Sequence, residues 1–368
     1  MHTLKNVAAG VALGALVSLS ATAGQVSVYG RIDTGFSYLG QDLGNGSEHS
    51  FSMGSGLSTG SRVGLKGEED LGNGLKAGFI LENQFMSDTG ALRSSTFWER
   101  ESSVYLEHAS WGKLQLGRLG YMRGAVSSVG WFAAYSPFAT VAGSYIVGSG
   151  KTAGNGCLKA NNSVVYTTPN FAGLQVALQY SLANTDEGTN ENSDNRYVAL
   201  GARYINGPVN LAMIVDSTLL TGDKTKTVNK HTKDNPLAVT VAGTYDLTSV
   251  KLYGVASYFQ DSDLPTLGEI TKASGTAAQG FDGFGVTLGA SVPVTSGELK
   301  FAAGYFDAND VDSQASDDVT RWHLGAGYQH RFTKRTYAYL YTGYAAQKQD
   351  HHADQKGYET ILGLLHFF

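Results

Sequence analysis

The sequence predicts an all-β fold, a single 16-stranded antiparallel β-barrel that crosses a membrane. From Gln25 onward the chain falls into runs of about ten residues in which apolar and polar side chains alternate, as in a β-strand. The connections between these runs are alternately short and long, which is typical of bacterial transmembrane barrels. The composition agrees, because 47 Gly, 20 Tyr and 16 Phe suit tight turns and pleated strands, and Pro occurs only 6 times.

The first residues have a different character and predict a secretory signal peptide over 1–23. Lys5 precedes the uncharged run VAAGVALGALVSLSATA, which ends in the small-x-small pattern Ala21-Thr22-Ala23. The alternative is an N-terminal membrane anchor, but the apolar core is short and rich in alanine. We therefore expect a mature chain of residues 24–368 that forms one barrel domain. No later run approaches the roughly 18 uncharged apolar residues of a membrane-spanning helix.

Charge and cysteine content exclude several classes of function. Without Lys5, the formal net charge of −5 becomes about −6, which does not favour a nucleic-acid partner. Cys157 is the single cysteine, so no intrachain disulfide can form. The sequence has no HExxH pattern and no paired cysteines, and we expect neither a metal nor a cofactor.

The predicted strands follow one another along the whole mature chain. They are placed at 25–39, 56–67, 74–86, 97–108, 113–119, 160–168, 174–183, 195–205, 209–218, 237–246, 250–260, 281–292, 298–307, 320–331, 336–347 and 357–368. Tight turns are predicted at 169–173, 206–208, 246–249 and 332–335, and long polar connections at 219–236 and 261–280. One end of the sheet should carry turns and the other end loops.

The two faces of the strands decide between a membrane barrel and a soluble sandwich. In the run 237–246, Leu237, Val239 and Val241 alternate with small or polar residues, and any single hairpin of this kind also fits a sandwich. Many such strands with glycine-rich polar faces fit a wall whose apolar face meets lipid and whose polar face meets water. An open sheet edge in hydrocarbon would leave backbone groups without hydrogen bonds, so the sheet must close.

Several motifs give the chain a recognisable resemblance. They are Ser27-Val28-Tyr29-Gly30-Arg31-Ile32-Asp33, the stretch 61–77 (SRVGLKGEEDLGNGLKA), Leu116-Gly117-Arg118, Asn162-Ser163-Val164 followed by Tyr166 and Pro169-Asn170-Phe171, Thr333-Lys334-Arg335-Thr336, and Gly363-Leu364 with His366 and the terminal Phe368. The chain resembles the trimeric general porins of Gram-negative bacteria, of the betaproteobacterial and neisserial type. The resemblance implies a homotrimer in the outer membrane, among lipid and lipopolysaccharide, that passes small hydrophilic solutes and ions. It also implies that the third long loop, 120–158, folds into the barrel and narrows it.

The same resemblance implies a ladder of basic residues at the constriction. It places Arg62 and Arg100 on the ladder, with Lys66 and Arg31 near them, and Lys159 where the family has an arginine. Within 120–158 there is no Asp or Glu, so the acidic half of the usual transverse field is absent from the loop. We expect Glu82 or Asp33 to replace it in part, and Arg123, Lys151 and Arg118 to add positive charge. Arg118 shares the alternation of Leu114 and Leu116, which argues against a lumen position. A ring of basic residues favours anions, and we predict an anion-preferring pore.

The run 97–108 departs from clean alternation. Glu99, Glu101 and Glu107 fall on one face with Tyr105, opposite Arg100. Carboxylates facing lipid are costly, so we expect this face to meet another subunit; a shifted register is the other interpretation.

Other functions remain open from the residues alone. Aromatic side chains of the loop could guide saccharides through a substrate-specific channel, or could pack the loop to the wall (Trp131, Phe132, Tyr135, Phe138). An enzyme is weakly suggested by Gly150-Lys151-Thr152, by His108-Ala109-Ser110 and by His351-His352 with Asp354, none of which completes a catalytic motif. A structural or adhesive barrel is the third alternative.

Overall fold

The computed structural model describes most of the residues from Gln25 to Phe368. The described residues are 25–138, 142–148, 151, 159–182, 195–220, 235–262, 264–265, 270, 280–310 and 318–368. The predicted signal peptide 1–23, parts of the loop 120–158 and Cys157 lie outside them. No helix among the described residues is long and apolar enough to cross a membrane.

The described chain is built almost wholly from β-strands. They are β1 (Gln25–Asp42), β2 (Ser47–Ser55), β3 (Arg62–Gly72), β4 (Leu75–Gln84), β5 (Glu101–His108), β6 (Gly112–Gly120), β7 (Lys159–Thr167), β8 (Leu174–Ser181), β9 (Arg196–Asn206), β10 (Val209–Leu219), β11 (Leu237–Asp246), β12 (Lys251–Ser262), β13 (Phe281–Val294), β14 (Gly297–Asp310), β15 (Asp318–Arg331), β16 (Thr336–Gln349) and β17 (Gln355–Phe367). A short 3-10 helix, η1 (Phe132–Tyr135), lies in the connection between β6 and β7.

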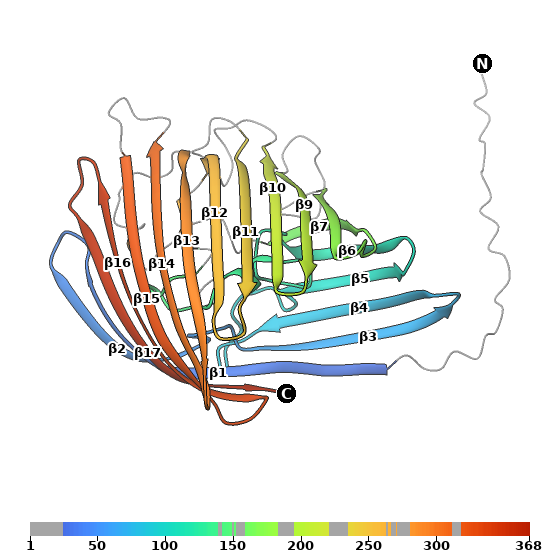
Figure 1. The fold of residues 1–368 in the computed structure, drawn as a ribbon, viewed down its shortest axis with the longest axis horizontal. Helices are drawn as coiled ribbons and strands as arrows, with labels where there is room; N and C mark the ends of the chain where they lie inside the picture. Colours follow the sequence, from blue (N-terminus) through green and yellow to red (C-terminus); the bar gives the residue numbers. More distant parts are fainter. Residues whose placement is uncertain are drawn as a thin grey trace, which may run out of the picture.

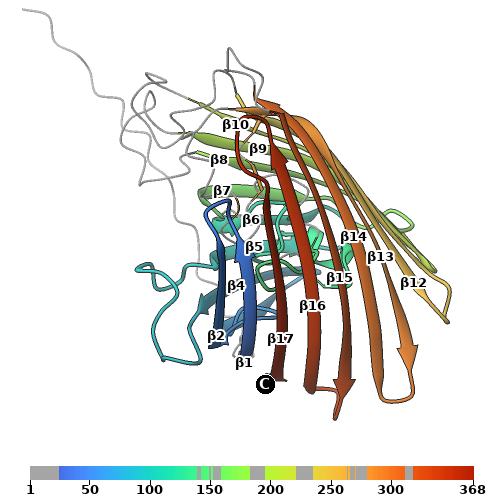
Figure 2. The same cartoon turned by 90° about the vertical axis from the view of Figure 1, so that its left-hand side faces the viewer.

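All of these strands belong to one antiparallel sheet that closes on itself through β1. The residues 31–42 of β1 pair with 356–367 of β17, and Figure 2 shows the two strands side by side. The other edge of β1 pairs with β2 in its second half and with β3 in its first half. Counting β2 and β3 as two halves of one strand gives the sixteen positions of the predicted barrel. Figure 1 shows β9 to β17 as a fan of roughly parallel ribbons, with β3 to β5 crossing them at a steep angle.

The second barrel strand differs from its prediction. The sequence predicts a strand at 56–67, but residues 56–61 lie between β2 and β3, and 47–55 forms a strand. The backbone N–H groups of Ser58 and Thr59 donate to the buried Asp33 carboxylate at 2.9 and 2.7 Å, which holds this break inward. Residues 47–55 (SEHSFSMGS) are mostly polar and show little apolar alternation, but pairing to β1 needs only their backbone.

The two ends of the barrel differ as predicted. Tight turns join β3 to β4, β5 to β6, β7 to β8, β9 to β10, β11 to β12, β13 to β14 and β15 to β16. The opposite end carries the long connections, the longest of which runs from β6 to β7 over 121–158, together with two short ones at 43–46 and 350–354. The hairpin β3–β4 turns at Asn73 and Gly74, both with positive φ, and Glu68 to Asp70 still pair with β4.

Exposure confirms the two-faced strand pattern. On β11 the outward Val241 is 46 % exposed, while its neighbour Thr240 is fully buried on the inward face. On β3 and β4, Val63, Leu65 and Phe79 share the outward face, as the registers of the β1–β3 and β3–β4 pairs require. Large apolar side chains therefore cover the lipid-facing wall, while the inward face carries many small or polar residues together with buried apolar ones.

The strand β5 corrects the expectation for the glutamates at 97–108. It begins only at Glu101, which pairs with Glu82 of β4, so Glu101 and Tyr105 are buried on the inward face. The outward face carries Val104 and Leu106, which are exposed. The shifted register is thus the correct interpretation, and these carboxylates do not form a face toward another subunit.

The main packed core lies inside the barrel, between the inner wall and the described parts of the long β6–β7 connection. One cluster joins Tyr121, Met122, Trp131, Phe132 and Tyr135 to Ala160, Ala177, Tyr197, Ala199, Ala212, Ile214, Ala242 and Val255 of the strands β7 to β12. A second cluster joins Phe138, Ala142, Ile146 and Val147 to Ala302, Tyr339, Tyr341, Ile361 and Leu365 of β14, β16 and β17. The connection therefore contacts the interior on two opposite sides.

The outward face gives a first test. We expect Leu324→Arg, in the middle of β15 and 51 % exposed, to lower the free energy of unfolding in phospholipid vesicles by about 2–4 kcal/mol. The control is Gln329→Arg on the inward face of the same strand, which should change stability by less than half as much. Equal losses in the two variants would contradict the assignment of the faces.

Candidate functional site

The register of three neighbouring strands brings basic residues together on the inner wall. Arg31 of β1 lies opposite Arg62 of β3, and Arg62 lies opposite Gln84 of β4. Glu82 lies two residues before Gln84 on β4, and so on the same face. Arg100, one residue before β5, hydrogen-bonds to Glu82 and Gln84 and completes the group. We call Arg31, Arg62, Arg100 and Glu82 the arginine cluster.

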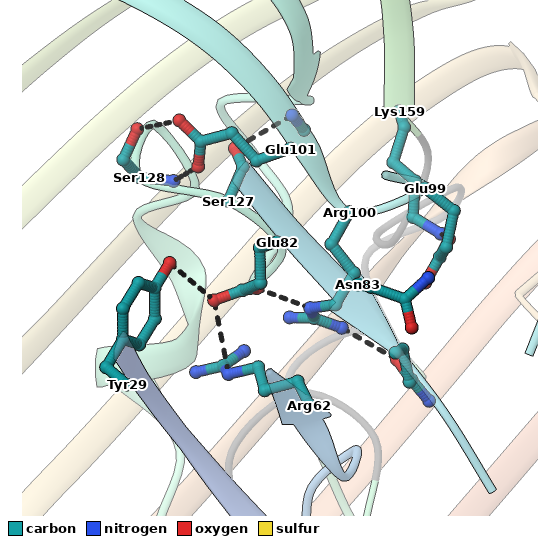
Figure 3. A network of polar contacts seen from close by, with 12 residues as sticks. Tyr29, Arg62, Glu82, Asn83, Glu99, Arg100, Glu101, Ser127, Ser128 and Lys159 are labelled. Atoms are coloured by element: carbon teal, nitrogen blue, oxygen red, sulfur yellow. Dashed lines mark hydrogen bonds and ion pairs between the residues drawn. The ribbon is translucent and has the colours of Figure 1, made fainter. Parts of the chain in front are cut away.

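Glu82 is the centre of this cluster, as Figure 3 shows. One carboxylate oxygen of Glu82 lies 2.5 Å from Arg100 Nε, and the other lies 3.4 Å from Arg62 Nε. The Tyr29 hydroxyl donates to the same carboxylate at 3.2 Å. The Arg62 side chain is 22 % exposed, against 7 % for Arg100 and 8 % for Glu82. Of the two arginines that pair with Glu82, Arg62 is therefore the one that solutes in the channel can approach.

The cluster carries excess positive charge. The Arg31 guanidinium lies 5.6 Å from the ring centre of Phe367, and its Nε is buried without a hydrogen-bond partner. Arg62 and Arg100 thus share the Glu82 carboxylate, and Arg31 adds a third positive charge, so the four residues of the cluster carry a formal charge of about +2. Lys66, four residues after Arg62 on the same face, lies 5.5 Å from the Tyr29 ring centre and extends the positive strip toward the turns.

Two further predicted residues lie in a neighbouring group rather than in the cluster. Lys159, at the start of β7, forms an ion pair with the buried Glu99, so its charge is largely neutralised. Arg118 donates from Nε to the Glu99 backbone carbonyl at 2.9 Å and from a terminal nitrogen to Asn161. In the β5–β6 register Arg118 lies opposite Ser102, at a position that alternates in the same way as Leu114 and Leu116.

Asp33 is the other acid expected to replace the missing acids of the loop, and its carboxylate accepts hydrogen bonds from the break between β2 and β3 and from β16. It is fully buried and accepts hydrogen bonds from the backbone of Ser58 and Thr59 and from the Tyr339 hydroxyl at 2.5 Å. Glu82 is therefore the acid that forms ion pairs within the arginine cluster, while the hydrogen bonds of Asp33 shape the break between β2 and β3.

The loop cation Arg123 is buried against the wall. Its Nε and one terminal nitrogen donate to the two carboxylate oxygens of Asp216 on β10 at 2.6 and 3.0 Å. Burial by itself lowers the pKa of the guanidinium, but the Asp216 carboxylate raises this pKa above its ordinary value. Arg123 therefore ties the loop to β10 and adds no open charge to the channel.

Lys151 is also turned into the loop. Its ammonium group donates to the carbonyl oxygens of Ala142, Gly143 and Ser144 at 3.1, 2.8 and 2.8 Å, and its side chain is buried. The backbone N–H groups of Ser144 and Tyr145 in turn donate to the buried Glu359 of β17. The loop is thus held at this end by a wall carboxylate.

A third wall carboxylate holds the start of the loop. Glu101 of β5 accepts hydrogen bonds from the Ser128 backbone N–H and hydroxyl, both at 2.7 Å, and from Gln115 at 2.9 Å. Sequence reasoning did not assign Glu101, Asp216 and Glu359 this role. The sequence signal for this anchoring role is a loop without acids combined with acids at inward positions of the strands. Only the fold shows which of these acids contact the loop.

The aromatic residues of the loop are part of its packing. Phe132, Tyr135 and Phe138 are each no more than 2 % exposed, and Trp131 is 9 % exposed. Their contacts are with wall residues, and the Tyr135 hydroxyl donates to Asn210 at 2.8 Å. They form no continuous exposed track for a saccharide.

The residues that weakly suggested catalysis have structural contacts. His108 lies at the β5–β6 turn, where Nε2 contacts the Asn73 carbonyl and Nδ1 accepts the Ser110 backbone N–H, both at 3.0 Å. Lys151 is engaged with loop carbonyls, and its neighbours Gly150 and Thr152 lie outside the described residues.

Comparison with known proteins agrees with this architecture. A family model described as Gram-negative porin matches residues 8–352. The chain belongs to this family. It is a porin, a diffusion channel of the outer membrane and a member of a family of non-enzymatic channels.

Two curated relatives match over most of their length, and a third matches over half. An outer membrane porin protein of Bordetella pertussis is 29 % identical over 355 residues, which cover 87 % of this chain and 88 % of the relative. Outer membrane porin protein 32 of Delftia acidovorans is 30 % identical over 343 residues, covering 89 % and 86 %. The major outer membrane protein P.IB of Neisseria meningitidis serogroup B is 33 % identical over half of each chain.

Solved structures share the fold. An anion-selective porin from Comamonas acidovorans superposes with a TM-score of 0.70 at 24 % identity and covers 94 % of this chain and all of that one. The trimer form of OmpT, an outer membrane protein of Vibrio cholerae, gives a TM-score of 0.63 at 15 % identity, with 94 % of this chain and all of that one covered. These likenesses show a closed porin barrel.

The loop anchor at β10 gives a second test. We expect Asp216→Asn to lower the free energy of unfolding by about 3–5 kcal/mol, because it removes the buried carboxylate that pairs with the buried Arg123 guanidinium. The double variant Arg123→Met with Asp216→Leu removes both charges and should recover most of that loss. Urea unfolding in lipid vesicles measures both values, and a double variant less stable than Asp216→Asn would speak against a simple charge-pair anchor.

Proposed function

We propose that this porin passes anions in preference to cations, and that the arginine cluster sets the preference. The observation that carries the proposal is the charge count of the arginine cluster on the inner wall. Arg62 and Arg100 share the Glu82 carboxylate, and Arg31 lies opposite Arg62 as a third positive charge. The segment 120–158 adds no acid to oppose them. The excess positive charge therefore acts on any ion that passes close to Arg62.

Electrostatic screening does not remove this effect. The Debye length is about 8 Å at physiological salt, so charges in a narrow pore act on a passing ion with incomplete screening. Rings of basic side chains select anions in channels of other kinds. One of the solved porins with the same fold is described as anion-selective, which lends limited support at 24 % identity.

The proposal includes a narrowing of the channel by the segment 120–158. The described residues of this segment pack against β7 to β12 and against β14 to β17. Wall carboxylates bind them at Arg123, Ser128 and Ser144. A segment fixed at several points on the inner wall reduces the open cross-section and brings passing solutes toward the arginine cluster.

The proposed assembly is a homotrimer in the outer-membrane lipid, as is typical of the family. The outward side chains Phe36, Phe51 and Met53 on β1 and β2 are 42, 70 and 54 % exposed. Among the described residues β2 pairs only with β1, so its other edge retains unpaired backbone groups. This apolar face with an open strand edge is suited to contact a neighbouring subunit.

The ion preference is tested by reversal potentials in a KCl gradient across planar bilayers. We expect the wild type to favour chloride, and Arg62→Ala to move the reversal potential toward zero, because the formal charge of the cluster falls from about +2 to about +1. Arg335→Ala, at an exposed turn, should leave the potential unchanged. A cation-preferring wild type would refute the proposal.

Glu82→Gln tests the same cluster in the opposite direction. Without the carboxylate the formal charge of the cluster rises, so the preference for chloride should increase. The free energy of unfolding should fall by about 3–5 kcal/mol, since the buried Arg100 loses its ion-pair partner. Glu69→Gln, on the outward face of the same hairpin, is the matched control. If Glu82→Gln does not change the chloride preference, the charges that select anions do not lie in the arginine cluster.

The trimer is tested by native mass spectrometry of the protein extracted in detergent. We expect three copies for the wild type and dissociation into monomers for Phe51→Asp, which puts a charge on the exposed face of β2. Leu288→Asp changes an exposed residue on the distant strand β13 and should leave the trimer intact. A monomeric wild type would contradict the proposed assembly.

A further inference from the structure

A second group of basic residues lies apart from the arginine cluster, in a pocket of about 450 Å³. Its wall side comes from the strands β5 to β9 and from the turns at 108–112 and 167–174, so it lies toward the tight-turn end of the barrel. Its opposite side comes from Met122, Ser128 and Trp131 of the β6–β7 connection. In the porin family the tight turns face the periplasm.

Arg203 of β9 is held in this pocket in a fixed orientation. Its guanidinium lies 5.1 Å from the ring centre of Trp131, and one terminal nitrogen donates to Gln175 Oε1 at 3.2 Å. Its Nε is buried and has no hydrogen-bond partner. A guanidinium fixed by an aromatic ring and an amide is preorganised, and its terminal nitrogens can bind a carboxylate through two parallel hydrogen bonds.

Lys113 of β6 supplies the second positive charge. Its ammonium nitrogen lies 3.8 Å from the centre of the Tyr105 ring. Among the described residues, neither Lys113 nor Arg203 has a carboxylate within ion-pair distance. Both cations are thus balanced by aromatic rings, which stabilise a cation without neutralising it.

The remaining groups that line the pocket determine the net charge of a complementary ligand. Glu107 is the acid of the lining and lies opposite Lys113 in the β5–β6 register. Two cations and one acid leave a formal charge of about +1, which a monoanion balances. Gln115, Gln175 and Thr168 add amide and hydroxyl groups to the lining. The complementary ligand therefore has one carboxylate and several hydroxyl groups.

We propose that this pocket binds small hydroxylated monocarboxylates on the periplasmic side of the loop, with the carboxylate on Arg203 and a hydroxyl group near Lys113. The site requires an open channel but does not require the ion preference assigned to the arginine cluster. The two proposals can therefore fail separately.

The test uses single-channel recordings in KCl with sodium gluconate added to each side of the bilayer in turn. We expect gluconate to reduce the chloride current in a saturable way, more strongly from the turn side, while sorbitol at the same concentrations does not. Arg203→Gln should raise the half-maximal gluconate concentration about tenfold, because the charged donors to the carboxylate are lost. Lys113→Gln should raise it about threefold.

Lys251→Gln is the matched control. Lys251 lies on an aromatic ring near the turn end, 5.4 Å from the centre of Tyr253, but outside the pocket. It should change the half-maximal concentration by less than twofold. Absence of a saturable gluconate effect, an equal effect of sorbitol, or an equal effect of Lys251→Gln would each overturn the proposal. Reversal potentials of the same variants report separately on the arginine cluster, and Lys113→Gln decides the question if Arg203→Gln yields no channels.

Discussion

The structure depends on one constraint, which is that backbone N–H and C=O groups cannot be left facing hydrocarbon without a hydrogen-bond partner. A single sheet meets it only by closing, and β1 closes this one by pairing with β17 on one edge and with β2 and β3 on the other. Closure fixes the registers, and the registers fix which residues become neighbours. Arg31 meets Arg62, and Glu82 faces both, because β1, β3 and β4 are adjacent in the closed sheet.

The closed wall also determines how its interior is filled. Many inward residues near the loop are small, such as Ala177, Ala199, Ala212 and Ala242, and leave room for the aromatic side chains of the β6–β7 connection. The apolar contacts hold the connection against the wall, and carboxylates at Glu101, Asp216 and Glu359 satisfy its backbone and its arginine. Asp216 is paired with Arg123, and Glu101 and Glu359 accept hydrogen bonds from the connection, so Glu82 is the carboxylate that forms ion pairs with the arginine cluster. The β6–β7 connection has no acids of its own in 120–158, and carboxylates of the wall strands bind it instead.

Positive charge in the channel is consequently kept in two different ways. In the arginine cluster several guanidinium groups share one carboxylate, and a net charge remains after pairing. At Lys113 and Arg203 the cations lie against aromatic rings, which hold the side chains in place and leave their charge available. The first arrangement suits a general influence on small ions, and the second suits recognition of a particular anionic group.

The sequence by itself determined the barrel, because strand alternation and the pattern of turns and loops are local properties that repeat along the chain. It also placed Arg62 and Lys66 on the inward face. It failed at 47–61 and at 97–101, where the strand boundaries depend on hydrogen bonds to Asp33 and on the pairing of Glu82 with Glu101. Only the tertiary structure decided that Arg123 and Lys151 are turned away from the channel and that Lys159 is paired with Glu99. The net charge at such a site is a sum over partners from distant parts of the chain, and only folding brings those partners together.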